Sequence, residues 1–213
     1  MALTDKLTAI ANAIRGKTGK TDSLTLDQMA TEIAGIQAGG GGQWTTDGIA
    51  NASEPNGDLT INVTAITSYA FYKCAEITSV NAPNLVNLSA NAFYDCKKMT
   101  SINLPVCIAL GQNCMSYTPI EVLDLPSAAK LEYGALTNMS SLKTLILRRP
   151  EGVTLLHTYA FQGTAFASGG AGGTIYVPQA LIDSGFYTTA TNWSVVNGYG
   201  TITWKAIEGS EYE

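Results

Sequence analysis

The chain is poor in the residues from which most catalytic sites are built. It has one histidine, His157, and only 14% of its residues are charged, where about a quarter is usual. Nucleophilic and general-base chemistry need a histidine held by a third group, and no two acidic residues recur at a spacing that would pair them. We therefore expect no enzyme, no catalytic residue, and no bound cofactor or metal.

Long basic runs and long apolar runs are also missing. The net charge is −5, and the longest basic runs are the pairs Lys97–Lys98 and Arg148–Arg149, so no patch matches the charge of a phosphate backbone. No stretch approaches the roughly eighteen consecutive apolar residues of a membrane span. The first residues lack the basic-then-apolar order of a secretory signal. We expect no nucleic-acid partner, no membrane insertion and no export signal in the chain as given.

What the sequence does contain is an internal repeat. Residues 70–83 recur as residues 92–105, with Ala-Phe-Tyr, Cys, Thr-Ser, Asn and Pro at matching positions. Five units open on a small residue, at steps of 22, 22, 21 and 25 residues: Ala70, Ala92, Cys114, Ala135 and Ala160. A fixed period in this range indicates a solenoid. A solenoid coil buries its apolar face only against neighbouring coils, so we expect an elongated surface suited to binding.

Within each unit, the apolar positions predict both a core and a strand. A large residue follows the opening one and is expected to fill the core: Phe71, Phe93, Met115, Leu136 and Phe161. Further on, two apolar residues stand two positions apart, as Val80 and Ala82 do. This alternation predicts one short strand in each coil, paired in parallel with its neighbours. His157 falls where other units have polar residues, which predicts an exposed side chain.

The segments on either side of the repeats predict other structures. Residues 1–38 show two stretches of helical periodicity, and the four glycines after them form a flexible tether. A strand around Leu59 is expected to cover the first coil, and a short helix after Pro178 to begin a cap. Residues 208–213 predict a solvated tail. The chain thus divides into four parts: a helical pair (1–38), a tether and opening segment (39–58), the solenoid (59–178) and a carboxy-terminal cap (179–213).

The four cysteines are Cys74, Cys96, Cys107 and Cys114, and the first two occupy the same repeat position. Strands of adjacent coils lie about 4.8 Å apart, which places these two thiols near bridging distance. A column of small buried side chains is the favoured interpretation, since unpaired cysteine is among the most buried residue types. A disulfide and a metal site remain as alternatives.

The outward faces of the predicted strands supply the candidate ligand-binding residues. One outward column, read along the coils, is Asn81, Asn103, Asp124, Ile146 and Tyr176. Amides and a carboxylate at coil spacing, followed by an aromatic ring, suit a sugar or an extended peptide, although a merely solvated sheet face has the same pattern. A second set lies beside the core positions, and exposed tyrosines are common in contact surfaces: Tyr69, Tyr72, Tyr94, Tyr117, Tyr133 and Tyr159.

The repeat closely resembles the BspA-like class of bacterial leucine-rich repeats. Ile66–Pro83 and Leu88–Pro105 match nearly every position of the pattern Ile-x-x-x-Ala-Phe-x-x-Cys-x-x-Leu-x-x-Ile-x-Leu-Pro. The resemblance covers roughly residues 59 to 178 and implies an α+β fold, a leucine-rich-repeat solenoid of about five coils with short parallel strands. In that family it implies surface adhesion, with a partner that varies among members.

The flanking segments resemble a different group of proteins. Residues 7–33 look like the opening segment of tail-associated proteins of phages and prophages from Gram-positive bacteria, and residues 175–182 and 190–194 look like their closing segment. This implies a particle-associated binding protein that assembles through residues 1–38 and contacts a bacterial cell surface through its repeats. The alternative is a bacterial surface adhesin that binds a host protein or glycan. Either places the protein on a particle or at a cell surface.

Overall fold

A computed structural model describes residues 44–46, 57–157, 159–166, 172–189 and 202–213. The chain divides into two units, residues 1–42 and 43–213, and the described residues all belong to the second. The predicted helical pair and the glycine tether therefore lie outside the described residues. So do residues 167–171 and residues 190–201.

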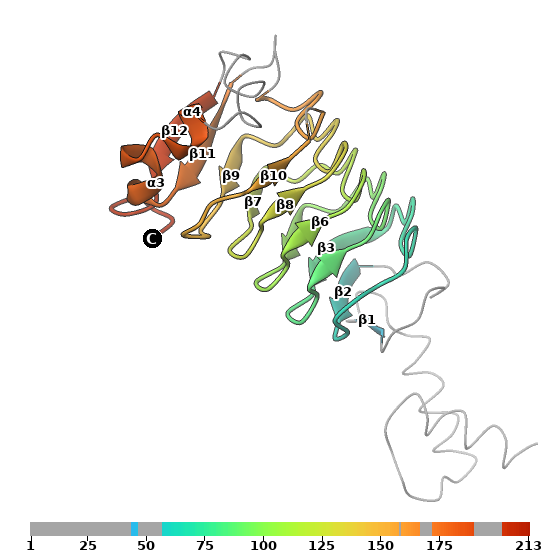
Figure 1. The fold of residues 1–213 in the computed structure, drawn as a ribbon. Coiled ribbons are helices and arrows are strands. Elements are labelled where there is room, and N and C mark those ends of the chain that lie inside the picture. Colours follow the sequence, from blue (N-terminus) through green and yellow to red (C-terminus); the bar gives the residue numbers. More distant parts are fainter. Residues whose placement is uncertain (1–43, 47–56, 158, 167–171, 190–201) are drawn as a thin grey trace, which may run out of the picture. The chain divides into compact units, whose positions relative to one another are not determined.

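Eight short parallel strands form one face of the second unit, which we call the ladder face (Figure 1). They fall into two sheets, ordered β1-β2-β3-β5 and β7-β9-β11-β12, with β5 next to β7. The bounds are β1 Trp44–Thr46, β2 Gly57–Ile61, β3 Ile77–Asn81, β5 Ser101–Asn103, β7 Val122–Asp124, β9 Thr144–Ile146, β11 Gly173–Val177 and β12 Ile202–Ala206. Equivalent repeat positions pair directly, Val80 with Ile102 and Leu123 with Leu145. The prediction of stacked coils joined by parallel strands is confirmed, including the opening strand β2.

A third parallel sheet, separate from the two sheets of the ladder face, runs along the coils and was not predicted from the sequence. Its strands have two residues each and pair in the order β10-β8-β6-β4: β4 Asn87–Leu88, β6 Ala109–Leu110, β8 Lys130–Leu131 and β10 Leu155–Leu156. The prediction of a single strand in each coil is therefore wrong. A strand of two residues shows no alternation along the chain, so only its pairing across coils reveals it.

Turn segments form a third hydrogen-bonded side, which we call the turn face. The N–H of Tyr69 donates to the carbonyl of Ala90 at 3.0 Å, and the N–H of Phe71 donates to that of Ala92 at 2.8 Å. The same pattern recurs one coil later, where Phe93 N–H donates to Cys114 at 2.8 Å. Each coil is thus tied to the next on three sides, which satisfies the backbone groups of even its irregular segments.

The core lies between these three sides and is built from the predicted column. All five members are at most 1% exposed: Phe71, Phe93, Met115, Leu136 and Phe161. Phe71 and Phe93 stack with ring centroids 5.1 Å apart and planes 7° apart. Because successive coils place these side chains on top of one another, each coil supplies the apolar surface that the next coil needs.

Two repeat positions take the left-handed backbone conformation, the first in four of the coils and the second in five. One precedes the small residue that opens the unit and is Asn91, Asn113 or Gly134 in the central coils. The other lies two residues after the core plug and is Asp95 or Asn138 in two of the coils. Two features favour glycine at position 134. Its φ is +62°, and a Cβ there would lie 2.0 Å from Oδ1 of Asn113. Asparagine, aspartate and glycine are the residues that adopt this conformation at least cost.

The carboxy-terminal part covers the last coil. As predicted, a short helix follows Pro178: α3 spans Gln179–Asp183, and α4 spans Phe186–Thr189. Tyr187 stacks on Trp204 of β12, with ring centroids 4.9 Å apart, and its hydroxyl accepts a hydrogen bond from Val153 N–H at 3.2 Å. In the part of the chain that the structure describes, these two helices are the only ones, and neither has the length of a membrane span.

Candidate binding surfaces of the repeat region

The amino-terminal half of the ladder face carries an exposed polar column. Asn81 and Asn103 pair directly across β3 and β5, and Nδ2 of Asn103 donates to Oδ1 of Asn81 at 2.8 Å. Beside them, the carboxylate of Asp58 accepts from Oγ of Ser79 at 2.6 Å and from Oγ1 of Thr78 at 3.0 Å. These bonds, that of Ser79 first, lower the pKa of Asp58. The predicted outward direction of Asn81 and Asn103 is confirmed.

The third residue of the column, Asp124, is half-buried and has a partner. Nε of Arg148 donates to both of its carboxylate oxygens, at 3.1 Å and 2.9 Å. Beside it on β7, the side chain of Val122 is 47% exposed. The carboxylate therefore presents an ion pair to solvent at this point of the column.

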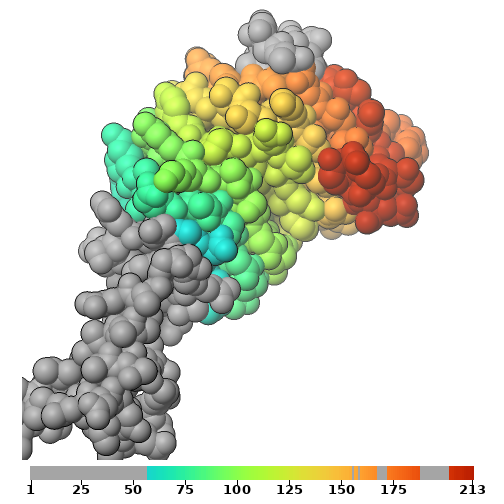
Figure 2. All heavy atoms as spheres, turned by 180° about the vertical axis from the view of Figure 1, so that it is seen from behind, coloured from blue at the N-terminus to red at the C-terminus, as the bar shows by residue number. Residues whose placement is uncertain are grey.

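The last two residues of the predicted ligand-binding column, Ile146 and Tyr176, are not exposed. Only 2% of Ile146 and 8% of Tyr176 is accessible, because residues 207–213 fold back over β9 and β11. Ile207 packs against both, and the rings of Tyr176 and Tyr212 meet edge to face at 4.8 Å. In Figure 2 these last residues, in dark red, lie against the yellow coils.

Two sequence predictions are corrected by this packing. The column does not continue to Ile146 and Tyr176 as an open surface, and residues 208–213 are not simply a solvated tail. The reason is the apolar character of the two outward residues, whose burial beneath Ile207 and Tyr212 lowers the free energy of the folded chain. Backbone bonds hold the segment in place, with Ile207 N–H donating to Val177 at 3.0 Å.

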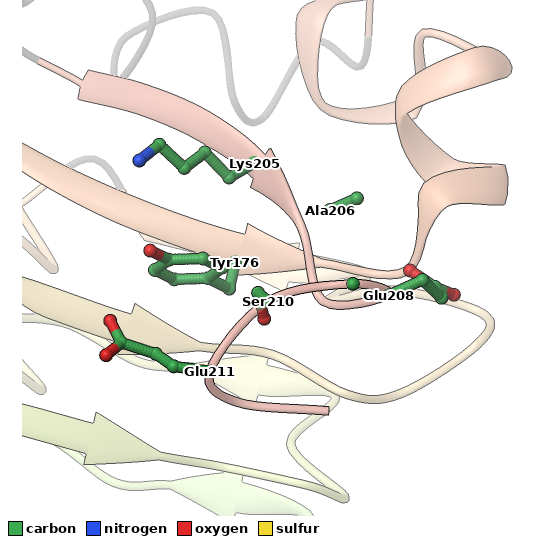
Figure 3. A pocket seen from close by; sticks show the side chains of 7 residues that line it. Tyr176, Lys205, Ala206, Glu208, Ser210 and Glu211 are labelled. Atoms are coloured by element: carbon green, nitrogen blue, oxygen red, sulfur yellow. The ribbon is translucent and has the colours of Figure 1, made fainter.

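A hollow of about 420 Å³ lies at the edge of this covered region. Figure 3 shows Tyr176 between Lys205 on one side and the segment of Ser210 and Glu211 on the other. Nζ of Lys205 lies 5.9 Å from the centre of the Tyr176 ring. The hollow is thus bounded by residues of β11, β12 and the tail that covers them.

The turn face carries the second predicted set, six tyrosines that we call the aromatic ridge: Tyr69, Tyr72, Tyr94, Tyr117, Tyr133 and Tyr159. Five of them are more than one-third exposed, and Tyr94 is half-buried. Tyr72 stacks on Tyr94 with centroids 5.1 Å apart, and Tyr94 meets Tyr117 edge to face at 5.3 Å. Neighbouring coils thus place aromatic rings in contact along the stack.

His157 also lies on the turn face. Its ring is half-buried, 4.9 Å from Tyr133 and 6.0 Å from Tyr159, and its Nδ1 accepts from Tyr159 N–H at 3.4 Å. The histidine therefore belongs to the aromatic surface, where it contributes a ring. The sequence predicted an exposed side chain, and His157 is instead half-buried among the two tyrosines.

The cysteines occupy the core side of the coils. Cys96, Cys107 and Cys114 are buried, and Sγ of Cys96 donates to the carbonyl of Phe71 at 3.2 Å. Burial raises the pKa of Cys96 to about 12 and that of Cys107 to about 11. All four thiols are unbridged, and the described ranges hold no cluster of three or more metal-ligating residues. The prediction of a buried column is confirmed for Cys96 and Cys114, whereas Cys74, at the same repeat position as Cys96, is half-buried.

A known repeat family matches the sequence of these coils. Residues 53–168 match the BspA type leucine rich repeat region in six copies, one more than the five unit openings found in the sequence. The chain belongs to this family. The match indicates a repeat scaffold and no enzyme family.

Among solved structures, the chain is similar to the crystal structure of a leucine-rich repeat protein from Bacteroides ovatus, at 14% identity and a TM-score of 0.40. The match covers 65% of this chain and 52% of that one, so the chain spans about half of that protein's length. No curated protein matches significantly.

Proposed function

We propose that the chain is a non-enzymatic binding protein of a phage- or prophage-type tail, which contacts a bacterial cell surface through its repeats. The observation that carries the proposal is the ladder face, where Asn81 and Asn103 stand exposed, in register and linked by a hydrogen bond of 2.8 Å. Side chains already held in their bound arrangement lose little entropy on binding. The contact surface of this face comprises Asn81, Asn103 and Asp124, without the covered Ile146 and Tyr176.

The particle-borne part of the proposal rests on the flanking segments. Residues 7–33 and 175–182 resemble segments of tail-associated proteins, and a separate amino-terminal module joined by glycines suits attachment to a larger assembly. On this view residues 1–38 assemble onto the particle, and the solenoid of residues 59–178, closed by the cap of 179–213, extends toward the ligand. The ligand is a protein or a glycan of the cell surface.

Electron microscopy with a labelled antibody against the repeats tests the location. The proposal requires label on particles released by induced lysis. The family match favours one other function, that of a surface adhesin, because the BspA-like resemblance implies adhesion. That alternative requires label on the cell wall and none on particles.

Binding of the fluorescently labelled full chain to intact bacterial cells tests the contact surface. We expect Asn81→Ala combined with Asn103→Ala to lower the amount of bound protein severalfold, because both amides are exposed. We expect the fold to stay intact, since substitutions at exposed positions usually change stability little. Thr100→Ala, at another exposed position near the same strands, is the matched control. Unchanged binding by the double variant contradicts a role for the ladder face.

A further inference from the structure

We propose that the aromatic ridge on the turn face is a binding surface for an uncharged polysaccharide that lies along the stack of coils. This surface is distinct from the ladder face, and the inference holds whether the protein is carried by a particle or by a cell. Three observations support it: the backbone conformation at two of the tyrosines, the rigid support beneath the rings, and the balance of positive and negative charge around them.

The backbone conformation is the first observation. Tyr69 occupies the first left-handed position of its coil, before the opening residue, with φ of 63°. Tyr117 occupies the second position of another coil, two residues after the core plug, with φ of 64°. Most equivalent positions hold residues that tolerate this conformation: Asn91, Asn113 and Gly134, and Asp95, Asn138 and Gly163. The exception is Lys73, whose φ is 58° and whose ammonium group lies over the ridge ring of Tyr72. A bulky side chain at positive φ is strained. Such strain, observed where the fold has an easier residue available, is a sign of function.

Packing does not explain why tyrosine stands at these two positions. The side chain of Tyr69 is 59% exposed and that of Tyr117 is 47% exposed, so neither fills the core. An asparagine at either position suits the backbone better and gives up little buried apolar surface. The strain at both tyrosines is therefore best explained by something that the exposed rings contact.

The support beneath the rings is the second observation. Backbone bonds join the turn segments at successive coils, for example Lys73 N–H to Tyr94 at 2.7 Å and Asn113 N–H to Tyr133 at 3.0 Å. The rings also hold one another, since Tyr69 meets Tyr72 at 5.4 Å and Tyr133 meets Tyr159 at 5.6 Å. Nζ of Lys73 lies over the Tyr72 ring at 5.2 Å. A surface fixed before binding loses little entropy when a ligand docks.

The chemistry of the surface selects the ligand. A pyranose ring has an apolar C–H face, which stacks on an aromatic ring, and a rim of hydroxyls that exchange hydrogen bonds with phenols and amides. The turn segments supply both kinds of group, because Gln112, Asn113 and Gln162 stand on them beside the tyrosines. Besides His157 and the phenols, the ionisable groups on and beside the described turn segments include Lys73, Asp95, Lys97 and Glu132, of mixed sign, and Nζ of Lys97 lies 3.9 Å from the Asp95 carboxylate. An uncharged polymer fits this composition better than an anionic or a cationic one.

A peptide fits less well. Extended peptides bind largely through main-chain hydrogen bonds, and proline-rich peptides need an aromatic groove. On the turn face the N–H groups of Tyr69, Phe71 and Lys73 already donate to the next coil. Neither of the two hollows described on the second unit, one beside Tyr176 and one beside Ile108, is lined by a ridge tyrosine.

Affinity gel electrophoresis of the full chain tests the inference. Native gels contain dextran, galactomannan, hydroxyethyl cellulose or mixed-linkage β-glucan, all uncharged and soluble. We expect slower migration in at least one gel, and Tyr69→Asn combined with Tyr117→Asn should weaken that binding about tenfold, the effect of losing about 1.4 kcal/mol of contact. The same double variant should unfold at a higher temperature than the parent chain, because the strain is relieved.

The combination of these two results separates a binding role from a structural one. A merely structural role for the tyrosines predicts a lower unfolding temperature in the double variant. Val122→Ala, which removes an equally exposed apolar group from the ladder face, is the matched control and should migrate like the parent chain.

Three outcomes overturn the inference: no slowing in any of the gels, equal slowing of the parent chain and the double tyrosine variant, or binding of a proline-rich peptide that the double variant loses. The first two leave the proposed function standing as long as the full chain still binds intact cells and loses that binding with the ladder-face asparagines.

Discussion

The two halves of the ladder face use the same repeat position in opposite ways. In the amino-terminal half, Asn81 and Asn103 are exposed and bonded to each other. In the carboxy-terminal half, Ile146 and Tyr176 occupy the equivalent place and lie beneath residues 207–213. Backbone pairing is alike in both, with each residue directly opposite its counterpart in the next coil.

This difference shows that the repeat determines the direction in which a side chain points but not whether that side chain is accessible to solvent. Parallel pairing in register points every residue of this column outward. Whether the side chain meets solvent then depends on what lies over it. Among the residues that the structure describes, a returning segment covers only the carboxy-terminal half of this column. The predictions below test this contrast, beginning with the core that both halves share.

Loss of a core plug should have the largest effect. Phe93→Ala should lower the free energy of unfolding by about 3–5 kcal/mol, because the ring is fully buried and stacked on Phe71. Urea denaturation followed by circular dichroism measures it. Lys97→Ala, at an exposed position of the same coil, should change stability by less than about 0.5 kcal/mol. A loss below about 1 kcal/mol for Phe93→Ala would contradict the stacking of the coils.

High pH should destabilise the amino-terminal coils first. The pKa of Cys96 is raised by burial from 9.0 to about 12, so the folded chain holds this proton more tightly than the unfolded chain does. Stability is therefore full below about pH 9 and falls as the pH rises toward 12. In the carboxy-terminal part, burial raises the pKa of Tyr187 from 10.0 to about 12, so its loss begins about one unit later.

Hydrogen exchange at a series of pH values measures the two onsets separately, once the intrinsic dependence of exchange on pH has been removed. Cys96→Ala should flatten the dependence in the amino-terminal coils, with Cys74→Ala, at a half-buried thiol, as the comparison. Simultaneous loss of protection in both halves from pH 9 would count against the assignment.

Substitution on the two halves of the column should give unequal effects. Ile146→Ala should cost about 2 kcal/mol, because an almost fully buried side chain is truncated. Asn103→Ala, at the same repeat position, should cost less than about 1 kcal/mol, the net value of one exposed hydrogen bond. Chemical denaturation compares them. Equal losses would mean that the tail does not cover the face.

Truncation of the covering tail should have a smaller effect than truncation of the Ile146 side chain that it covers. Tyr212→Ala removes a half-buried ring that meets Tyr176 at 4.8 Å and should cost about 1 kcal/mol. It should also increase the fluorescence of a hydrophobic dye, because Tyr176 and Ile146 become accessible. Glu211→Ala, at an exposed neighbouring position, serves as the control and should leave dye binding unchanged.

Much of the fold could be predicted from the sequence, because equivalent positions of a repeat take equivalent places in successive coils. The period predicted the coils, the residue after each opening alanine predicted the core, and the spacing of two apolar residues predicted the strands of the ladder face. The sheet of β4, β6, β8 and β10 was not predicted because its strands have two residues each, too few to show an alternation of apolar and polar side chains. The candidate site was predicted in direction and only partly in exposure.

What the sequence by itself determined is the stacking: residues such as Phe71 and Phe93 can be buried only against their counterparts in neighbouring coils. What only the tertiary structure decided is which outward side chains remain accessible. Ile207 and Tyr212 lie more than thirty positions along the chain from Tyr176 and more than sixty from Ile146. No local sequence pattern encodes contacts between residues so far apart. The strain at Tyr69 and Tyr117 likewise could be recognised only from the backbone angles of the structure, because the identity of a residue does not specify its φ.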